Sequence, residues 1–415
     1  MNNYLTTNTI KHTLANLNLL TFEVTDACNL KCKYCGYGEF YEDYDERKNQ
    51  YLSTDYAKAV IDFLVPYWNS PLNTSVQKRV YVGFYGGEPL LNMPFIEAVI
   101  DYILNLKLDK QIVFEFSMTT NALLLERYMD FIVKHKFNTL ISLDGNRENT
   151  AYRVDNGGQP AFDRIIKNVN ALRNAYPDYF DKYVNFNSVL HNKNSVESIY
   201  TYIKDEYDKI PAISELNNMG IRPEKRDLFE RTYKDYQESI SSSENYRDIE
   251  RGMFIKSGTY QTVSTFLQQY SGFVFKDYTD LLLDEKEGKR RPTGTCSPFS
   301  KKMFITVNGK ILPCERIGQQ FALGTVDNNG VHLDLDSIAE KYNNYFSKLE
   351  KQCSYCKQCK SCVQCIFNLE NIDNKPVCTN FMNETDFENY VREQVHFLAQ
   401  NPEEYYRIME EVIIE

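Results

Sequence analysis

Eleven cysteines are the residues of this sequence with the most evident chemistry, and three of them share one short stretch. Cys28, Cys32 and Cys35 are separated by three and then two residues, directly after an apolar run that predicts a β-strand. Three thiolates on one loop can ligate three irons of a 4Fe-4S cube, whereas a full set needs four cysteines. The spacing therefore predicts a cluster with one iron open to another ligand.

A zinc knuckle is the alternative for this loop, because cysteines also bind zinc. Structural zinc sites use paired Cys-x2-Cys units and four ligands in all. No histidine and no fourth cysteine lies near Cys28–Cys35 in the sequence, so the spacing favours an iron-sulfur cluster.

Composition restricts the partners of the chain. Its 415 residues carry a net charge of -10 with a pI near 5.3, which disfavours nucleic acid because phosphate binding needs a basic surface. Residues 1–16 are polar, and no stretch is long and apolar enough to span a bilayer, so we expect a cytoplasmic protein without membrane contact. In that reducing compartment, cysteines indicate metal or cluster ligation rather than disulfides.

Short apolar runs alternate with amphipathic helical patterns through the first half of the chain. The predicted strands are Leu19–Thr25, Arg79–Tyr85, Ile112–Thr119, Thr139–Leu143 and Tyr183–Leu190, with a sixth near Ile210–Leu216. The predicted helices are Thr54–Trp68, Pro94–Leu106, Leu123–His135, Ala161–Ala175 and Ser195–Tyr207. This alternation predicts a parallel α/β sheet, although periodicity alone does not distinguish a barrel from a doubly wound sheet.

A polar motif accompanies the end of each of the first four predicted strands, where parallel α/β folds bind their ligands. The cysteine loop follows the first strand. Gly86-Gly87-Glu88-Pro89 follows the second, and its glycines allow backbone to approach a ligand closely. The remaining motif residues are Ser117 and Asn121 at the third strand, then Ser142, Asp144 and Arg153 at and beyond the fourth. Read alone, Asn121 is equally suited to cap a helix, and Asp144-Gly145 to form a turn.

In combination, these residues resemble the radical S-adenosylmethionine (SAM) enzymes, whose signature is this cysteine loop with an aromatic residue, here Tyr34, before the last cysteine. The resemblance implies a partial (β/α)6 barrel with SAM on the open iron. It also implies that one electron cleaves SAM to a 5′-deoxyadenosyl radical. The residues that it places beside SAM are Tyr34, Gly86, Gly87, Glu88, Pro89, Ser117, Asn121, Ser142, Asp144 and Arg153.

The other eight cysteines lie in the C-terminal third of the chain. Cys296 and Cys314 flank a hairpin predicted around Asn308-Gly309. The rest are Cys353, Cys356, Cys359, Cys362, Cys365 and Cys378. The pattern resembles the SPASM domain of radical peptide and protein maturases, which implies two auxiliary 4Fe-4S clusters and three in all. Repeated Cys-x2-Cys units also suit zinc ribbons.

The resemblance implies a ligand set for each auxiliary cluster. One would use Cys296, Cys314 and Cys365, and the other would use Cys353, Cys356, Cys362 and Cys378. Cys359 is extra, and Cys365 follows Cys362 after two residues where the family usually has three. The sequence does not decide whether Cys359 completes the first cluster, replaces a neighbour or remains free.

We expect four regions along the chain. A radical SAM core spans 1–220, a helical insertion or bridge 221–292, the SPASM domain 293–385 and a C-terminal helix 386–415. Helical patterns cover Asp227–Ile240 and Thr262–Tyr270 in the insertion, which ends in a charged linker over 285–292. The final acidic helical pattern runs from Glu384 to Ile414.

The resemblance implies a radical SAM oxidoreductase that abstracts hydrogen from a ribosomally made peptide and installs a thioether, C–C or C–O crosslink. The first alternative is an anaerobic sulfatase maturase, which oxidises Cys or Ser to formylglycine. Those enzymes usually carry an Asp after the hairpin cysteine as presumed base, where this chain has Glu315, our candidate catalytic residue. The second alternative is a non-catalytic iron-sulfur or zinc protein.

The implied partners are a precursor peptide or protein and an electron donor such as flavodoxin or ferredoxin. About twenty residues precede the first predicted strand, too few for an N-terminal leader-recognition domain. Leader docking on this chain, a separate leader-recognition protein and a substrate without a leader are the options. The five histidines adjoin no cysteine motif and are expected to be surface or core residues; they are His12, His135, His191, His332 and His396.

Overall fold

The structure of this protein is a computed structural model that describes residues 4–42, 46–75, 79–109, 111–218, 220–254, 258–270 and 291–410. The chain divides into two compact units. Asn8–Ile249 and Ser297–Leu335 form what we call the barrel unit, and Met1–Thr7, Glu250–Cys296 and Asp336–Glu415 form the cysteine-rich unit. The hairpin predicted within the SPASM region thus belongs to the barrel unit.

The barrel unit is built on a sheet of ten strands in the order β10-β9-β8-β7-β1-β2-β3-β4-β5-β6. Its parallel part comprises β1 (Leu19–Thr25), β2 (Arg79–Gly86), β3 (Val113–Thr120), β4 (Asn138–Ser142), β5 (Val184–Val189) and β6 (Ala212–Ser214). These six strands lie side by side in chain order, so the sheet has no point at which the direction of winding reverses. A partial (β/α)6 barrel is therefore confirmed, and a doubly wound sheet is excluded.

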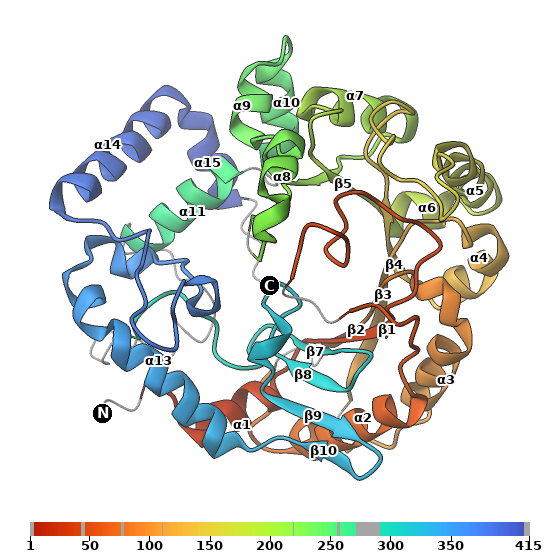
Figure 1. Cartoon of the computed structure of the whole chain (residues 1–415), viewed down its shortest axis with the longest axis horizontal. Coiled ribbons are helices and arrows are strands. Elements are labelled where there is room, and N and C mark those ends of the chain that lie inside the picture. Colours follow the sequence, from red (N-terminus) through yellow and green to blue (C-terminus); the bar gives the residue numbers. More distant parts are fainter. Residues whose placement is uncertain are drawn as a thin grey trace. The chain divides into compact units, whose positions relative to one another are not determined.

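Helices cover the outer side of the parallel strands (Figure 1). They are α2 (Thr54–Asn69), α3 (Met93–Leu104), α4 (Leu125–Lys134), α5 (Phe162–Ala175), α6 (Pro177–Tyr183) and α7 (Val196–Tyr207). The strand sequence explains this layering, since Phe22 of β1 packs edge-on against Phe95 of α3 with ring centroids 6.0 Å apart. Alternate residues of β1, Thr21 and Glu23, point to the opposite face and give the barrel a polar interior.

An antiparallel meander extends the sheet on the other side of β1. It consists of β7 (Met303–Ile305), β8 (Lys310–Leu312), β9 (Gly324–Asp327) and β10 (Gly330–His332), and β7 pairs in parallel with β1. The predicted hairpin is confirmed, because Phe304 pairs with Leu312 across the turn. Gly309 occupies that turn with φ of 75°, a conformation that residues with a side chain rarely adopt.

The helical insertion is more broken than its sequence predicts. The predicted helix Asp227–Ile240 is wrong, because α8 (Arg226–Thr232) ends at Tyr233, whose backbone is extended. A second helix, α9 (Tyr236–Ser241), starts after Asp235, which caps it by accepting a hydrogen bond from Glu238 N. The insertion continues with α10 (Tyr246–Met253) and α11 (Gly258–Tyr270), of which α11 confirms the predicted helix.

The cysteine-rich unit holds α13 (Leu335–Tyr355) and a pair of C-terminal helices, α14 (Glu384–Gln400) and α15 (Pro402–Glu410). The single predicted C-terminal helix is therefore divided, because Pro402 has no N–H to continue α14. α1 (Thr7–Ala15) was not predicted. Residues 411–414 of the predicted helix and 285–290 of the predicted linker lie outside the described residues. Within the described part of the chain, no helix has the length and hydropathy of a membrane span.

Candidate active site

The cysteine loop lies at the carboxyl end of β1 and is tied to a later segment of the chain, Tyr152–Asp155. Lys31 N donates to the carbonyl of Val154 at 2.7 Å, and Lys33 N donates to that of Tyr152 at 3.3 Å. Leu30 forms an isolated bridge with Asp155. The backbone between the first and last cysteine is thus fixed by hydrogen bonds rather than by side-chain packing alone.

Cys28, Cys32 and Cys35 are partly buried, and their thiols are close enough to influence one another electrostatically. Burial raises the pKa of the Cys28 thiol to about 11 and that of Cys32 to about 12, and the neighbouring thiols add to both shifts. Three thiols on one loop provide the donor set that a 4Fe-4S cluster with one open iron requires. Among the described residues, no three Cys, His, Asp or Glu side chains converge closely enough for a single metal ion.

The paired glycines at the end of β2 let the segment that follows this strand lie directly on the cysteine loop. Gly87 N donates to the carbonyl of Thr25 at 2.8 Å, and Glu88 N donates to that of Ala27 at 2.9 Å. A Cβ atom at Gly87 would lie 2.0 Å from the oxygen of Ala27, so only glycine fits. Gly87 thus brings the segment after β2 onto the backbone of the loop, and its approach to a ligand stays a prediction.

Glu88 links the ends of β2 and β3. It is fully buried, and its carboxylate accepts hydrogen bonds from the Thr120 hydroxyl at 2.7 Å and from Asn121 N at 2.8 Å. Burial raises the pKa of Glu88 to about 7, although these donors oppose the shift. Asn121 in turn donates through Nδ2 to Asn29 Oδ1 at 2.7 Å and approaches Cys28 Sγ at 3.7 Å. The third-strand motif therefore touches the cysteine loop.

Asp144, just past β4, is the centre of a buried ion pair. Arg153 donates to it through Nε at 3.0 Å and Nη2 at 2.8 Å. The Tyr34 hydroxyl and Val189 N also donate to this carboxylate. Burial alone would raise the pKa of Asp144, but Arg153 and His191 outweigh it and lower that pKa to about 2. Three residues predicted beside SAM thus contact one another.

The other predicted SAM contacts have simpler surroundings. Ser117 lies inside β3, opposite Gly83 of β2, rather than after the strand. Ser142 is the last residue of β4 and pairs with Asn187 of β5, while Pro89 begins a short 3-10 helix over Pro89–Asn92. Contact of any of these residues with SAM stays a prediction.

Sequence reasoning missed four residues that lie against the cysteine loop. His191 was expected to be unrelated to the cysteines, yet its ring stacks on Tyr34 with centroids 5.4 Å apart. Its signal was its place after β5, where the other motifs follow their own strands. Glu23, Tyr37 and Arg47 form a second group beside Cys35. Of these three residues, only Glu23 could have been recognised in the sequence, as a carboxylate within an apolar strand.

Cys314, the cysteine that follows the hairpin, also has charged neighbours. Burial raises the pKa of the Cys314 thiol to about 11, and the carboxylate of Glu315 adds to the shift. Glu315 Oε2 accepts a hydrogen bond from Lys302 Nζ at 2.7 Å and lies 3.7 Å from Cys314 Sγ. Burial alone would raise the pKa of Glu315, but Lys302 lowers it, so this residue is a carboxylate beside a thiol.

The six remaining C-terminal cysteines and Cys296 belong to the cysteine-rich unit. Burial raises the pKa of Cys353 to about 11, and its thiol neighbours are Cys362, Cys378 and Cys356. Cys365 has Cys296 as its thiol neighbour. Cys359 lies near Cys362. Gly294 packs on this loop so tightly that a Cβ atom there would lie 1.8 Å from the Cys362 oxygen.

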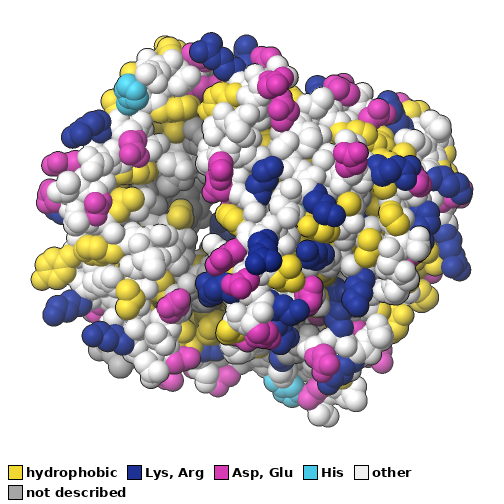
Figure 2. Space-filling model, turned by 45° about the horizontal axis from the view of Figure 1, so that its top comes forward, with side chains coloured by type: hydrophobic (Ala, Val, Ile, Leu, Met, Phe, Trp, Pro, Cys, Tyr) yellow, Lys and Arg dark blue, Asp and Glu magenta, His cyan; other side chains and the backbone are white. Residues whose placement is uncertain are grey.

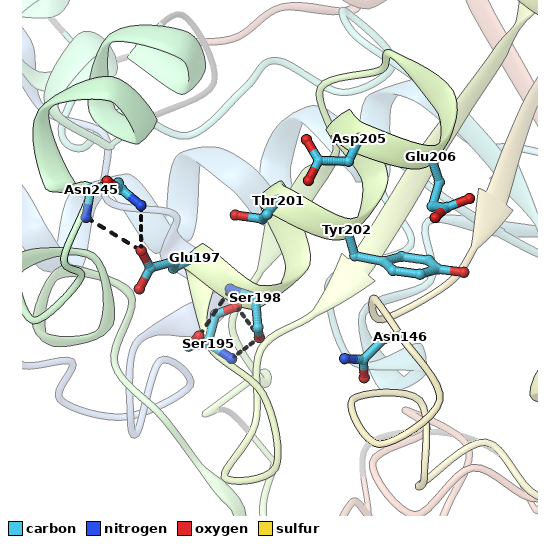
Figure 3. Close-up of a pocket in the computed structure, with 9 residues that line it drawn as sticks. All are labelled: Asn146, Ser195, Glu197, Ser198, Thr201, Tyr202, Asp205, Glu206 and Asn245. Carbon is cyan, nitrogen blue, oxygen red and sulfur yellow. Dashed lines mark hydrogen bonds between the residues drawn. The ribbon is translucent and has the colours of Figure 1, made fainter.

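One hollow on the barrel unit lies away from the cysteine loop. It has a volume of about 500 Å³ and follows α7 (Figure 3). Glu197 in its wall accepts hydrogen bonds from the backbone and side chain of Asn245, both at 3.3 Å. None of the predicted site residues lines it.

On the face drawn in Figure 2, acidic and basic side chains are interspersed.

An open parallel barrel with a three-cysteine loop and three further motifs at its carboxyl edge defines the radical SAM class of fold. Two family models match the sequence: that of the Radical SAM superfamily over residues 22–205, and that of SPASM, an iron-sulfur cluster-binding domain, over residues 296–363. The chain therefore contains a Radical SAM domain and a SPASM domain.

Two curated relatives indicate the range of the superfamily to which the chain is similar. The radical SAM cyclopropyl synthase TigE of Paramaledivibacter caminithermalis is 27% identical over 174 residues, covering 40% of this chain and 34% of TigE. A cysteine-type anaerobic sulfatase-maturating enzyme of Clostridium novyi is 23% identical over 312 residues, covering 73% of this chain and 74% of that enzyme. The chain therefore spans about a third of TigE and about three quarters of the maturating enzyme.

A solved structure shows the same likeness of fold. Native anSMEcpe with bound AdoMet and the Kp18Cys peptide has a TM-score of 0.56 at 18% sequence identity, covering 95% of this chain and 98% of that one.

The Asp144–Arg153 pair provides a test of what holds the site. Asp144→Asn leaves the guanidinium of Arg153 buried without its counter-charge, and we expect a loss of about 3–5 kcal/mol in the free energy of unfolding. The matched control is Asp163→Asn, which removes the carboxylate from the exposed Arg147–Asp163 pair. Urea denaturation followed by circular dichroism measures both, and equal losses for the two variants would refute this account of Asp144.

Proposed function

We propose that this chain is a maturase that cleaves SAM reductively and abstracts hydrogen from a carbon of a peptide or protein substrate. The observation that carries this proposal is the gathering of Cys28, Cys32 and Cys35 beside the motifs that end β2, β3 and β4. When bound, the cluster and SAM supply the electron and the 5′-deoxyadenosyl radical.

The residues of this chain hold and shield that chemistry. The three thiols would ligate the cluster, and burial of Cys32 keeps water from its surroundings. Glu88 and Asn121 hold β2 and β3 against the loop through the bonds described above. The Asp144–Arg153 pair and Tyr34 fix the loop from the side of β4. The predicted SAM contacts are part of this proposal.

We assign the auxiliary clusters as the resemblance implies. The grouping of Cys353 with Cys356, Cys362 and Cys378 supports one complete set of four thiols. The proximity of Cys365 to Cys296 supports the pairing of these two thiols in the other set. Only the resemblance adds Cys314 to that set. Cys359 lies beside Cys362, which belongs to the set of Cys353, and remains unassigned. Three 4Fe-4S clusters predict about twelve iron atoms per chain.

The proposal that this chain cleaves SAM is tested by removing the three loop thiols together. Replacing Cys28, Cys32 and Cys35 by Ala should abolish 5′-deoxyadenosine formation, because no other described cysteine lies on this loop. Iron should fall by about four atoms per chain while the auxiliary clusters stay bound. Anaerobic reconstitution, dithionite reduction and chromatography measure both. An intact, iron-loaded wild-type chain that makes no 5′-deoxyadenosine would instead support a non-catalytic iron-sulfur protein.

For the product, we propose a thioether, C–C or C–O crosslink in a ribosomally made peptide. Formylglycine formation is the second candidate, because the likeness to the sulfatase-maturating enzyme of Clostridium novyi extends over 73% of this chain. The partners proposed with either reaction are the peptide or protein substrate and an electron donor such as flavodoxin or ferredoxin, in the cytoplasm. A leader-recognition protein is a further option.

Mass spectrometry of a co-expressed, cysteine-containing candidate peptide distinguishes the two products. A crosslink removes two hydrogens and joins two residues, so fragment ions between the joined positions should be missing. Formylglycine instead replaces the thiol of one cysteine by an aldehyde, which reacts with a hydrazide probe. An aldehyde without a crosslink would overturn the first assignment and leave the radical chemistry intact.

Glu315 is proposed to accept the proton that leaves the substrate after hydrogen abstraction, while an auxiliary cluster would take up the remaining electron. Its carboxylate lies beside Cys314 and is oriented by Lys302. Glu315→Gln keeps the shape but removes the proton acceptor, so product should fall at least about a hundredfold, at the lower end of general-base effects. 5′-Deoxyadenosine formation and iron content should remain as in the wild type. Unchanged product with Gln at this position would remove Glu315 from the mechanism.

A further inference from the structure

A second group of buried side chains lies beside the cysteine loop and includes none of the motif residues recognised in the sequence. It starts at β1. Glu23 is 1% exposed in the middle of that strand. Its carboxylate accepts hydrogen bonds from the Tyr37 hydroxyl and from Val307 N, the latter at 2.8 Å. Tyr37 is therefore fixed two residues beyond Cys35, with its ring beside the last thiol of the loop.

Arg47 lies on that ring. Its guanidinium carbon is 4.5 Å from the centroid of Tyr37, which is a cation–π contact. Its Nη2 donates to Cys35 Sγ at 3.2 Å. The backbone next to Arg47 is anchored at the start of the cysteine loop, because Asp26 accepts hydrogen bonds from Lys48 N at 2.9 Å and Gln50 N at 2.6 Å.

The remaining feature of Arg47 is a donor without an acceptor. Its Nε is buried and has no hydrogen-bond partner. A buried N–H left unpaired costs about 1–3 kcal/mol, so such a group calls for an acceptor. Nε and Nη2 form one edge of the planar guanidinium, as Arg153 shows when it uses the same two nitrogens to bind Asp144. The free Nε–H of Arg47 therefore faces the same side as the Cys35 sulfur.

We propose that Arg47 donates two hydrogen bonds to the cluster, one to the Cys35 thiolate and one through Nε to a neighbouring cluster sulfur. This inference rests on the cluster proposed for this loop. Hydrogen bonds to the sulfurs and a nearby positive charge stabilise the reduced, more negative cluster, so Arg47 raises its reduction potential. The cluster that must reduce SAM is then easier for an electron donor to reduce.

The test is the midpoint potential of this cluster in the full-length, reconstituted chain. Mediated dithionite titration in the absence of SAM is followed by electron paramagnetic resonance, and the signal that changes on later addition of SAM identifies the cluster of this loop. Arg47→Met removes both donors and the charge. At a fixed solution potential near the midpoint, we expect the ratio of reduced to oxidised cluster to fall about tenfold, which is 59 mV for a one-electron couple.

Two further variants separate hydrogen bonding from charge. Arg47→Lys keeps the charge but loses the two-nitrogen edge, so its potential should lie between those of the wild type and Arg47→Met. Lys48→Met removes a charge from the adjacent exposed residue and should leave the potential unchanged. Iron and sulfide contents verify that each variant is loaded. If Arg47→Met does not retain its cluster, a lowered potential in loaded Arg47→Lys carries the proposal.

Each other outcome is decisive. An unchanged potential in loaded Arg47→Met or Arg47→Lys overturns the proposal, and so does an equal shift in Lys48→Met. Weaker SAM binding with an unchanged potential would assign the Nε donor to SAM instead and also overturn it. A loaded wild type that makes no 5′-deoxyadenosine, with a potential that still depends on Arg47, would refute the proposed function and leave this inference standing.

Discussion

The active-site end of the barrel depends on the hydrogen bonds that the buried carboxylate of Asp144 accepts. It accepts hydrogen bonds from Arg153, from the Tyr34 hydroxyl and from Val189 N, so it joins β4, the cysteine loop and β5. The Arg153 segment also supplies the carbonyls to which the loop's own N–H groups donate. A buried charge of this kind is retained only where partners surround it, because an unpaired carboxylate would be protonated or would unfold the site.

The parallel strands and the position of each motif at a strand end could be predicted from the sequence, because the period of apolar residues is a local signal. The choice of a barrel over a doubly wound sheet rested on the family resemblance. The partners of individual side chains could not be predicted. Glu88 resembles a cofactor contact in sequence, yet it accepts hydrogen bonds from Thr120 and Asn121. That pairing depends on the register between β2 and β3, which sets two strand ends side by side and has no counterpart in either segment alone.

Other features could not be predicted because their causes lie far along the chain. Nothing near Arg47 in the sequence indicates a thiol, and the contact arises only because Asp26 binds the backbone of the returning segment. The predicted helix over Asp227–Ile240 has good helical spacing, but Tyr233 takes an extended conformation and divides it. The auxiliary cysteines were the reverse case, since the family resemblance grouped Cys353 with Cys356, Cys362 and Cys378, which are its thiol neighbours in the structure.

The backbone contacts of the cysteine loop also bear on how a cluster could be assembled. Gly87 and Glu88 hold the carbonyls of Thr25 and Ala27, while residues 152 and 154 hold the N–H groups of Lys33 and Lys31. The loop therefore has few conformations to lose when its thiols take up iron. Ordering a free residue costs about 1–2 kcal/mol of conformational entropy, and here that cost is met when the barrel folds. The folded loop would therefore be preorganised to bind a cluster.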